Sequence, residues 1–358
     1  MPSSTRRRVH VLYEYGADFR PHASAHLRLL RPLAHPAVAR SVSATFGMAL
    51  DGRDADVVIV DRLWRPDIEP WRAAQLVSEI ATSGARLAYA IDDNLLDLPA
   101  ERDDWPEKRH LDSIRIFLDA ADAVLVTGTA LADRLAPLTR RTVVVPHALD
   151  ERLLRHDTAP PTETPFGPRP ITIGYMGTST HADDLEMIAP ALRAVLERHA
   201  GRVALEMVGV AEKDELRRLL GDLPVRVLAP GPAEREYPLF QLWFGSSVSW
   251  HIAVSPIRDT PFRRCKSDIK FLDYAAAGAA GVYSSTPAYD ETVRHGESGL
   301  VVDNASASWE AALDGLVIDE SLRETIARGA HRQLLRERTL QRCAPTWIDA
   351  IDAVLHPW

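Results

Sequence analysis

The chain has few of the features that mark several large protein classes. Only two of its 358 residues are cysteines, Cys265 and Cys343, too few for a disulfide framework or a cysteine-based zinc site. The sequence contains no run of about 18 apolar residues, so we expect no transmembrane helix. The net charge is -8, whereas nucleic-acid-binding proteins usually carry a basic excess. These absences favour a globular protein with no nucleic-acid partner.

Several catalytic and cofactor signatures are also missing. The sequence has no Walker-type loop, no nucleophile elbow and no GxGxxG fingerprint after its first apolar run. Its 13 histidines are scattered without the spacing of metal ligands. We therefore expect no cofactor and no metal. The expected location is the cytoplasm, and the basic cluster at residues 6–8 leaves peripheral association with the inner face of a membrane open.

Short apolar runs alternate with helical patterns in the first half of the chain, which is typical of parallel βαβ units. Five prolines then fall between Asp157 and Pro170, the composition of an interdomain linker. The expected strands and helices of this half are strands at 9–13, 56–61, 86–91, 123–126 and 141–145, and helices at 22–33, 71–83, 111–121 and 130–138.

After the linker the same alternation starts again. Two successive α/β segments predict two Rossmann-like domains facing across a cleft, at 1–160 and 161–343, with a last helix in 344–358 packing back on the first. Ligands of such sheets bind at the carboxyl ends of the strands. The expected elements are strands at 171–176, 204–208, 225–228, 249–254 and 281–284, and helices at 183–199, 212–220, 236–244, 266–277, 287–295, 309–316, 321–338 and 346–355.

Small polar residues follow the first expected strand of the second half. Backbone N–H groups of such a turn, with the helix N-terminus behind it, can bind a phosphate. A capped turn between a strand and a helix explains the same residues equally simply. The turn consists of Gly177, Thr178, Ser179, Thr180 and His181.

Two lysines and one carboxylate are spaced by helical turns in the segment 261–278. Lys266 and Lys270 are four residues apart, and Asp273 is one turn further on, so we expect them on one helix face. This set suits a nucleoside diphosphate, but a surface ladder of ion pairs has the same spacing. Small residues at 275–278 favour the ligand site, because they allow close approach.

Two further strand ends carry chemically useful side chains. Asp92 and Asp93 follow the expected strand at 86–91, and paired carboxylates there suit acid–base chemistry or binding of acceptor hydroxyl groups. They could equally cap the following turn. His147 ends the last strand of the first half, where a role in the turn is the simpler interpretation.

Taken together and in order, four segments resemble motifs of GT-B glycosyltransferases of the family-four-like group (glycosyl transferases group 1). The similarity is closest to bacterial O-antigen and surface-polysaccharide enzymes, and it runs from about Val9 to the C-terminus. Residues 89–95 are similar to Y-x-I/L-D-D-D/N-L, and residues 174–185 to G-Y-x-G-(S/T)-x-x-H-x-x-D-L. Residues 261–278 are similar to pFN-x-x-K-S-x-x-K-x-x-E-Y-A-A-x-G, and residues 295–300 belong to a stretch similar to hG-x-(N/T/S)-G-l-l-v.

The resemblance implies roles for the residues that carry it. The donor would bind the C-terminal domain and the acceptor mainly the N-terminal domain. Lys266 and Lys270 would stabilise the diphosphate without a metal, and Asp273 would bind the ribose. The implied catalytic residues are Asp92, Asp93, His181 and Lys270. The implied donor-binding residues are Gly177, Thr178, Ser179, Lys266, Ser267, Lys270, Asp273 and Tyr274.

Cys265 and Asp273 depart from the broader family, which has two glutamates separated by seven residues. The lysines would therefore carry more of the mechanism than the carboxylate. The predicted function is a glycosyltransferase of the hexosyltransferase class, retaining and metal-independent. It would transfer a sugar from a nucleotide-sugar donor to a glycan or lipid-linked glycan acceptor in bacterial surface-polysaccharide synthesis. A non-catalytic GT-B binding subunit and a nucleotide-sugar epimerase remain the alternatives.

Overall fold

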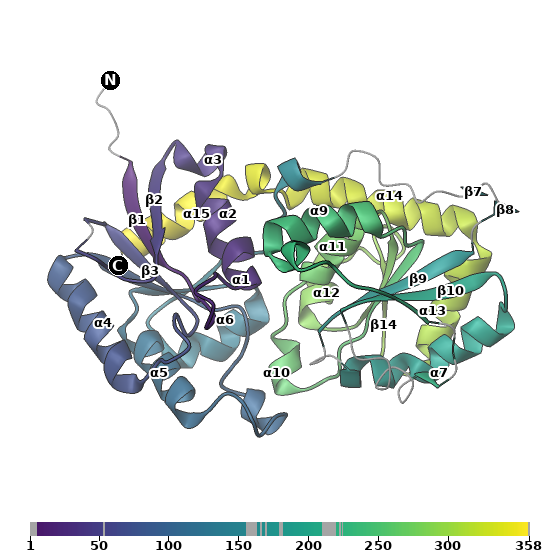
Figure 1. Ribbon diagram of the computed structural model, residues 1–358, viewed down its shortest axis with the longest axis horizontal. Coiled ribbons are helices and arrows are strands. Elements are labelled where there is room, and N and C mark those ends of the chain that lie inside the picture. Colours follow the sequence, from purple (N-terminus) through teal and green to yellow (C-terminus); the bar gives the residue numbers. More distant parts are fainter. Residues whose placement is uncertain are drawn as a thin grey trace. The chain divides into compact units, whose positions relative to one another are not determined.

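The computed structural model shows two compact units (Figure 1). Unit 1 comprises Met1–Glu151, Pro261–Ser267 and Arg338–Trp358, and unit 2 comprises Arg152–Thr260 and Asp268–Glu337. A short segment from the second half of the sequence is thus part of unit 1. The structure describes residues 6–52, 54–154, 163–164, 167–168, 170–178, 182–209, 220–221, 223 and 225–356.

Unit 1 is built on a six-stranded sheet in which every pair of neighbours is parallel. Its strand order is β2-β1-β3-β4-β5-β6. The order places the ends of β1, β3 and β4 next to one another at the centre of the carboxyl edge. The strands are β1 (Arg7–Leu12), β2 (Val42–Gly47), β3 (Val57–Asp61), β4 (Arg86–Ala90), β5 (Ala123–Val126) and β6 (Thr142–Val144).

Both faces of this sheet are buried, so its central strands are apolar without interruption. In β3, Val58 and Val60 pack with α4, α5 and α6, whereas Val57 and Ile59 pack with α2, α3 and α15. The helices of unit 1 are α1 (Ala23–Ala25), a π-helical turn (His26–Leu30), α2 (Arg31–Ala34), α3 (Pro36–Ala39), α4 (Pro70–Ser83), α5 (Lys108–Ala120), α6 (Thr129–Leu135), α10 (Pro261–Arg264) and α15 (Leu340–Leu355). Short 3-10 helices occur at Leu98–Ala100, Ala136–Leu138 and Glu151–Leu153.

Unit 2 contains a second six-stranded parallel sheet, with the order β11-β10-β9-β12-β13-β14. A separate antiparallel pair is formed by β7 (Glu163–Thr164) and β8 (Gly167–Pro168). The strands of the large sheet are β9 (Ile171–Met176), β10 (Val203–Val208), β11 (Val225–Leu228), β12 (Ile252–Ser255), β13 (Ala280–Ser284) and β14 (Leu300–Val302).

The described helices of unit 2 cover this sheet. Helices α7 and α13 share one apolar core with β9 and β10. The indole of Trp250 lies over β9, where a Cβ atom on Gly174 would stand 1.8 Å from its ring. The helices are α7 (Ala182–Arg198), α9 (Tyr237–Ser247), α11 (Ile269–Ala277), α12 (Pro287–Thr292), α13 (Ser306–Ile318) and α14 (Glu320–Glu337), with a 3-10 turn at Ala233–Arg235.

The predicted α/β class with two Rossmann-like parallel sheets is confirmed. Each of the ten expected strands matches an observed strand of the two large sheets, and most of the expected helices form within a few residues of their predicted ends. Strand β2 was not expected: it pairs only with β1 and is half-exposed, so it lacks the apolar pattern of the central strands. The helix predicted at 212–220 lies almost wholly outside the described residues.

Two predicted helix starts are wrong. The helix expected at 266–277 begins only at Ile269, because Cys265 and Lys266 close i to i−3 turns that end α10. The helix expected at 346–355 begins at Leu340, where the Thr339 hydroxyl accepts a hydrogen bond from the Arg342 N–H. The expected helix starts just after Pro345, but this proline lies within the first two turns of α15.

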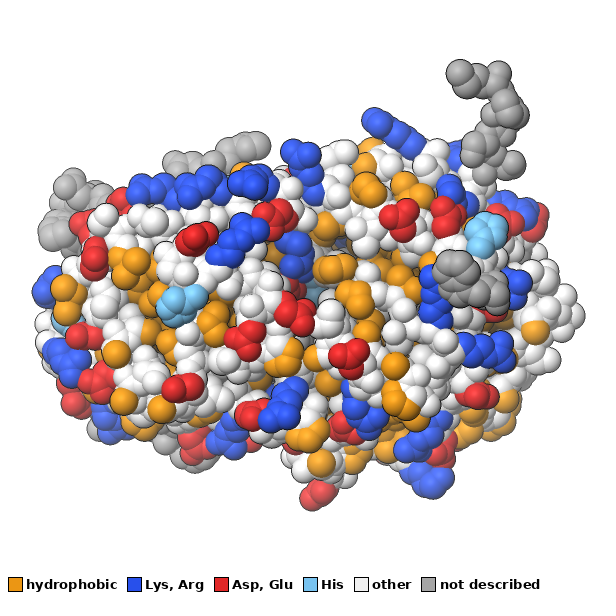
Figure 2. Space-filling model, turned by 180° about the vertical axis from the view of Figure 1, so that it is seen from behind, with side chains coloured by type: hydrophobic (Ala, Val, Ile, Leu, Met, Phe, Trp, Pro, Cys, Tyr) orange, Lys and Arg blue, Asp and Glu red, His pale blue; other side chains and the backbone are white. Residues whose placement is uncertain are grey.

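Two further observations concern the hydropathy of the helices and the charge of the surface. No helix among the described residues combines the length and apolar character needed to span a bilayer. Basic and acidic side chains are intermixed over the face that Figure 2 draws, so that face shows no broad region of a single charge.

Candidate functional site

The structure places Asp92 and Asp93 at the carboxyl edge of the unit 1 sheet, just after β4. Asp92 is half-buried between two arginines, 3.3 Å from Arg28 Nε and 3.4 Å from Arg62 Nε. Burial alone would raise the pKa of Asp92, but the arginines outweigh it and hold that pKa well below its usual range. Asp92 is therefore an ionised anchor and not a proton acceptor.

Asp93 is paired with Lys266. The Lys266 ammonium donates to Asp93 Oδ1 over 2.8 Å and lies 4.5 Å from the centre of the Phe262 ring. Both residues of the pair belong to unit 1, because Pro261–Ser267 is part of that unit. The carboxylate already neutralises the lysine charge that the sequence had assigned to the diphosphate.

Four charged residues near Asp92 and Asp93 were not expected to be functional. Arg28 pairs with the fully buried Asp61, and the Arg62 guanidinium lies 3.4 Å from Glu14 Oε2. The Glu14 N–H also donates to Asp61 Oδ2 over 3.1 Å. With the residues above they form the unit 1 charge cluster: Glu14, Arg28, Asp61, Arg62, Asp92, Asp93 and Lys266.

The backbone beneath this cluster is strained. Arg62 and Trp64 have φ values of 46° and 60°, a region that residues with side chains rarely adopt. Strained backbone and buried charges gather at functional sites more often than elsewhere. A sequence signal did exist for part of the cluster, since Glu14 and Arg62 follow expected strands. None existed for Arg28, which looks like any other polar residue of an amphipathic helix.

The predicted donor site falls in unit 2, at the carboxyl edge of the second sheet. The Gly177 N–H donates to the Val208 carbonyl oxygen over 3.1 Å, and Thr178 is exposed. A Cβ atom on Gly209, at the end of the neighbouring strand, would lie 2.9 Å from the Gly177 carbonyl oxygen. A side chain at position 209 would collide with the turn, so only a glycine fits there. Ser179, Thr180 and His181 lie outside the described residues.

Helix α11 supplies the charged groups of this site. Lys270 stands in its first turn, with the ammonium 4.8 Å from the centre of the Tyr175 ring. Asp273 is 7% exposed and hydrogen-bonded to Gln241. Burial raises the pKa of Asp273 to about 7, although Lys270 and the Gln241 hydrogen bond both act to lower it.

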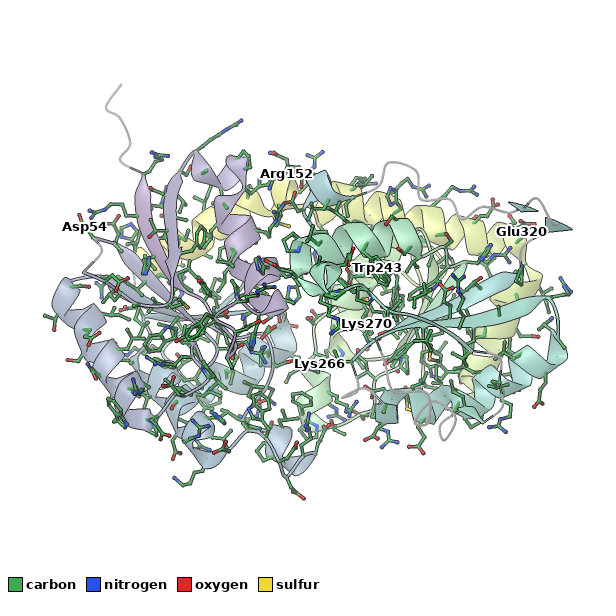
Figure 3. All side chains as sticks on the ribbon, viewed as in Figure 1. Asp54, Arg152, Trp243, Lys266, Lys270 and Glu320 are labelled. Atoms are coloured by element: carbon green, nitrogen blue, oxygen red, sulfur yellow. The ribbon has the colours of Figure 1, made fainter. Side chains whose placement is uncertain are left out.

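The sequence predicts Lys266 and Lys270 on one helix face, and this prediction is wrong. Lys266 precedes α11 and lies in unit 1, whereas Lys270 lies on α11 in unit 2 (Figure 3). Ser267 is the last residue of the unit 1 segment, and Asp268 begins the next segment of unit 2. Of the two lysines, only Lys270 belongs to the same unit as Asp273 and Gly177.

Three other parts of the predicted segment are buried. The buried Tyr274 hydroxyl donates to the Val254 carbonyl oxygen over 3.0 Å and accepts from the Met176 N–H over 3.3 Å, joining two strands. The small residues at 275–277 are buried, and His331 of α14 donates to the Ala275 carbonyl oxygen. Cys265 is buried, and desolvation raises the pKa of its thiol.

His147 is buried beside a cavity of about 20 Å³ that Arg28 and Trp347 also line. A space of that size holds one water molecule and no sugar. The His147 carbonyl oxygen accepts a hydrogen bond from Arg338 Nε over 2.8 Å. We therefore assign His147 to the packing of unit 1.

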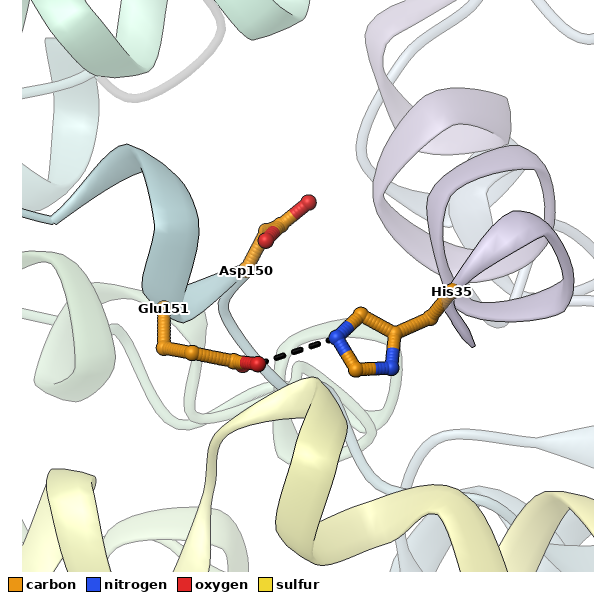
Figure 4. A group of neighbouring side chains, drawn as sticks. All are labelled: His35, Asp150 and Glu151. Carbon is orange, nitrogen blue, oxygen red and sulfur yellow. Dashed lines mark hydrogen bonds and ion pairs between the residues drawn. The ribbon is translucent and has the colours of Figure 1, made fainter. Parts of the chain in front are cut away.

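One group of side chains has the composition of a metal site (Figure 4): His35, Asp150 and Glu151. However, His35 Nδ1 accepts a hydrogen bond from the Ala37 N–H, so its proton is on Nε2 and is donated to Glu151 over 2.9 Å. Asp150 pairs with Arg31. These partners occupy the atoms that a metal would need.

Residues 170–319 match the family described as glycosyl transferases group 1. Among curated proteins, no sequence matches the chain at a significant level. The matched segment contains both the Gly177 turn and α11.

Several solved structures share the fold of this chain. HepE from Anabaena, solved with UDP and glucose, has a TM-score of 0.65 and 12% identity over 97% of this chain and 100% of HepE. Sucrose-phosphate synthase from Thermosynechococcus elongatus has a TM-score of 0.61 and 14% identity over 83% of this chain and 73% of its own. TarM from S. aureus, solved with UDP, has a TM-score of 0.60 and 10% identity, and the chain spans 56% of its length.

These likenesses and the two parallel sheets define the chain as a GT-B protein with two Rossmann-like domains. Its residues 170–319 are similar to the group 1 glycosyltransferases. The resemblance predicted from the motifs is confirmed.

Proposed function

We propose that the chain is a glycosyltransferase that moves a sugar from a nucleotide-sugar donor to a glycan or lipid-linked glycan acceptor. The observation that carries this proposal is the family match over 170–319, which includes the charged helix α11 and the Gly177 turn. HepE and TarM, both solved with UDP, support a nucleotide as part of the donor. Synthesis of a bacterial surface polysaccharide is the proposed setting.

The donor is assigned to unit 2. Lys270 neutralises the diphosphate, the backbone N–H groups that follow Gly177 hydrogen-bond its oxygens, and Asp273 accepts hydrogen bonds from the ribose hydroxyl groups. The lysine stabilises the negative charge that develops as the bond between the anomeric carbon and the diphosphate breaks. A residue in this position does the electrostatic work of a divalent metal, so the proposed transfer is metal-independent.

The acceptor is assigned to unit 1, where Asp92 and Asp93 end a strand. Both carboxylates are ion-paired, so their proposed task is to orient acceptor hydroxyl groups. The acceptor oxygen forms the new glycosidic bond, and its proton passes to the departing diphosphate. This route needs no protein base and retains the anomeric configuration. Lys266 is assigned to unit 1 as the partner of Asp93.

The test is product analysis with UDP-, GDP- and dTDP-linked hexoses, with glycan acceptors present. We expect release of a nucleoside diphosphate together with a new glycoside. A changed free nucleotide sugar would identify an epimerase, and binding without turnover would identify a non-catalytic subunit. Either of these results would overturn the proposal.

A further inference from the structure

The loop after β1 is closed into a fixed shape by its own backbone. Tyr15 and Pro21 form an antiparallel bridge, and the His22 N–H donates to the Glu14 carbonyl oxygen over 3.0 Å. Further backbone hydrogen bonds cross the tip. Residues 15–22, named here the β1 loop, therefore have a defined conformation at the carboxyl edge of the unit 1 sheet, where ligands of such sheets bind.

Phe19, at the tip of the β1 loop, combines two unfavourable properties. Its side chain is 67% exposed to solvent, and its φ of 61° lies in the left-handed region that glycine prefers. The ring is nevertheless held in place, because it stacks on the buried Tyr15 with centroids 6.0 Å apart. Stability alone would favour a glycine here, so the exposed ring points to a function.

A polar pair stands at the base of the same loop. His22 Nδ1 lies 3.3 Å from Glu14 Oε2, and the histidine side chain is 47% exposed whereas that of Glu14 is 8% exposed. The carboxylate fixes the orientation of the imidazole. A Cβ atom on Gly16 would stand 3.4 Å from His22 Nε2, so the glycine leaves space beside that nitrogen.

We propose that the β1 loop is a pyranose-binding subsite, with Phe19 stacking on the apolar face of a sugar ring and His22 Nε2 hydrogen-bonding one of its hydroxyl groups. An exposed aromatic ring and an oriented polar group in one loop match a pyranose, which has an apolar face and a rim of hydroxyl groups. The inference rests on the proposed function and assigns this ring to the acceptor. The acceptor class is then a hexopyranose residue of a glycan.

The binding experiment uses the full chain and methyl α- and β-hexopyranosides of glucose, galactose and mannose, followed by saturation-transfer difference NMR. Uridine and glycerol serve as comparison ligands, one with a flat aromatic ring and one with hydroxyl groups but no ring. Phe19→Gly removes the platform and relieves the left-handed strain. His22→Gln removes the imidazole, and Trp71→Ala, at an exposed residue of α4, is the matched control.

We expect at least one methyl hexopyranoside to bind, with a dissociation constant raised about fivefold by Phe19→Gly and unchanged by Trp71→Ala, a change of the size that an aromatic contact produces. Phe19→Gly should melt at or above the temperature of the wild type. A lower melting temperature with unchanged sugar binding would show that Phe19 is structural and would overturn the proposal. Uridine binding lost in Phe19→Gly, or no hexopyranoside binding to the wild type, would overturn it as well.

Failure of this inference is distinguishable from failure of the proposed function. Sugar transfer with normal acceptor KM in Phe19→Gly and His22→Gln would overturn the subsite alone. Hexopyranoside binding that depends on Phe19, without transfer from any donor, would overturn the glycosyltransferase assignment and leave the subsite intact.

Discussion

The proposed ribose contact of Asp273 predicts that nucleotide binding depends on pH and that one substitution removes this dependence. The side chain is buried in α11, and burial raises its pKa to about 7. The proposed ribose contact requires the carboxylate form, because both ribose hydroxyl groups donate to it. Lowering the pH through 7 protonates Asp273 and should therefore weaken the binding of nucleoside diphosphates.

The magnitude follows from the fraction of Asp273 that is ionised. With a pKa of about 7, roughly nine-tenths of the molecules carry the carboxylate at pH 8 and roughly one-tenth at pH 6. Nucleotide affinity should then fall about tenfold between these two pH values. In Asp273→Asn this dependence should disappear, and affinity at pH 8 should be lower than in the wild type.

The same pKa predicts a change in folding stability. The folded pKa lies above the ordinary value of 3.8, so the folded chain binds the proton more tightly than the unfolded chain does. The stability that depends on protonated Asp273 is fully present below pH 4 and is lost as the pH rises to 7, about 4 kcal/mol in total. Asp273→Asn should gain melting temperature relative to the wild type as the pH rises from 5 to 8.

Isothermal titration of UDP, GDP and dTDP between pH 5.5 and 8.5 measures the pH dependence of nucleotide affinity. Protonation of the nucleotide itself affects the wild type and Asp273→Asn alike, so the ratio of their affinities isolates the contribution of Asp273. A ratio that stays constant over this range would refute the proposed ribose contact.

Three further pairs of substitutions test other parts of the structure. Lys270→Ala should weaken nucleoside diphosphate binding roughly tenfold or more, the size of a lost charge-assisted hydrogen bond, whereas Lys266→Ala should leave it nearly unchanged; equal losses would contradict the separation of the two lysines. Arg62→Met removes a partner of both Glu14 and Asp92 and should destabilise unit 1 by about 3–5 kcal/mol, whereas Arg102→Ala, in a surface pair with Asp104, should lose less than about 1 kcal/mol in a denaturant titration. Gly174→Ala should lose about 3 kcal/mol or more because its Cβ would overlap Trp250, and Gly128→Ala, with open space around its Cβ, should lose about 1 kcal/mol or less; similar melting temperatures for the two would contradict the packing.

Most of the fold could be predicted because the central strands are short apolar runs between helical patterns. Strands β3, β5 and β13 are buried and stand out in the sequence. Strand β2 could not be recognised, since an edge strand with one neighbour needs no continuous apolar run. The assignment of Pro261–Ser267 to unit 1 could not be predicted either, because it depends on which sheet this short segment packs against and not on its composition.

The candidate site was predicted in part. Strand ends indicated Asp92, Asp93 and Gly177, which the structure places at the carboxyl edges of the two sheets, and helical spacing indicated Lys270 and Asp273, which lie on α11. Their roles stay predictions. The same spacing wrongly placed Lys266 on their helix, because two tight turns before α11 interrupt the period. Arg28 and Asp61 were missed because burial of a charge is a tertiary property: each lies in an ordinary element and is brought to its partner by the sheet order.

The most direct test of the donor site is a crystal structure of the chain with whichever of UDP, GDP and dTDP raises its melting temperature most. We predict that the ribose hydroxyl groups lie within hydrogen-bonding distance of Asp273 and that the diphosphate contacts Lys270 and the turn at Gly177. A nucleotide bound away from α11, with Asp273 and Lys270 making no contact to it, would contradict the assignment of the donor site to unit 2.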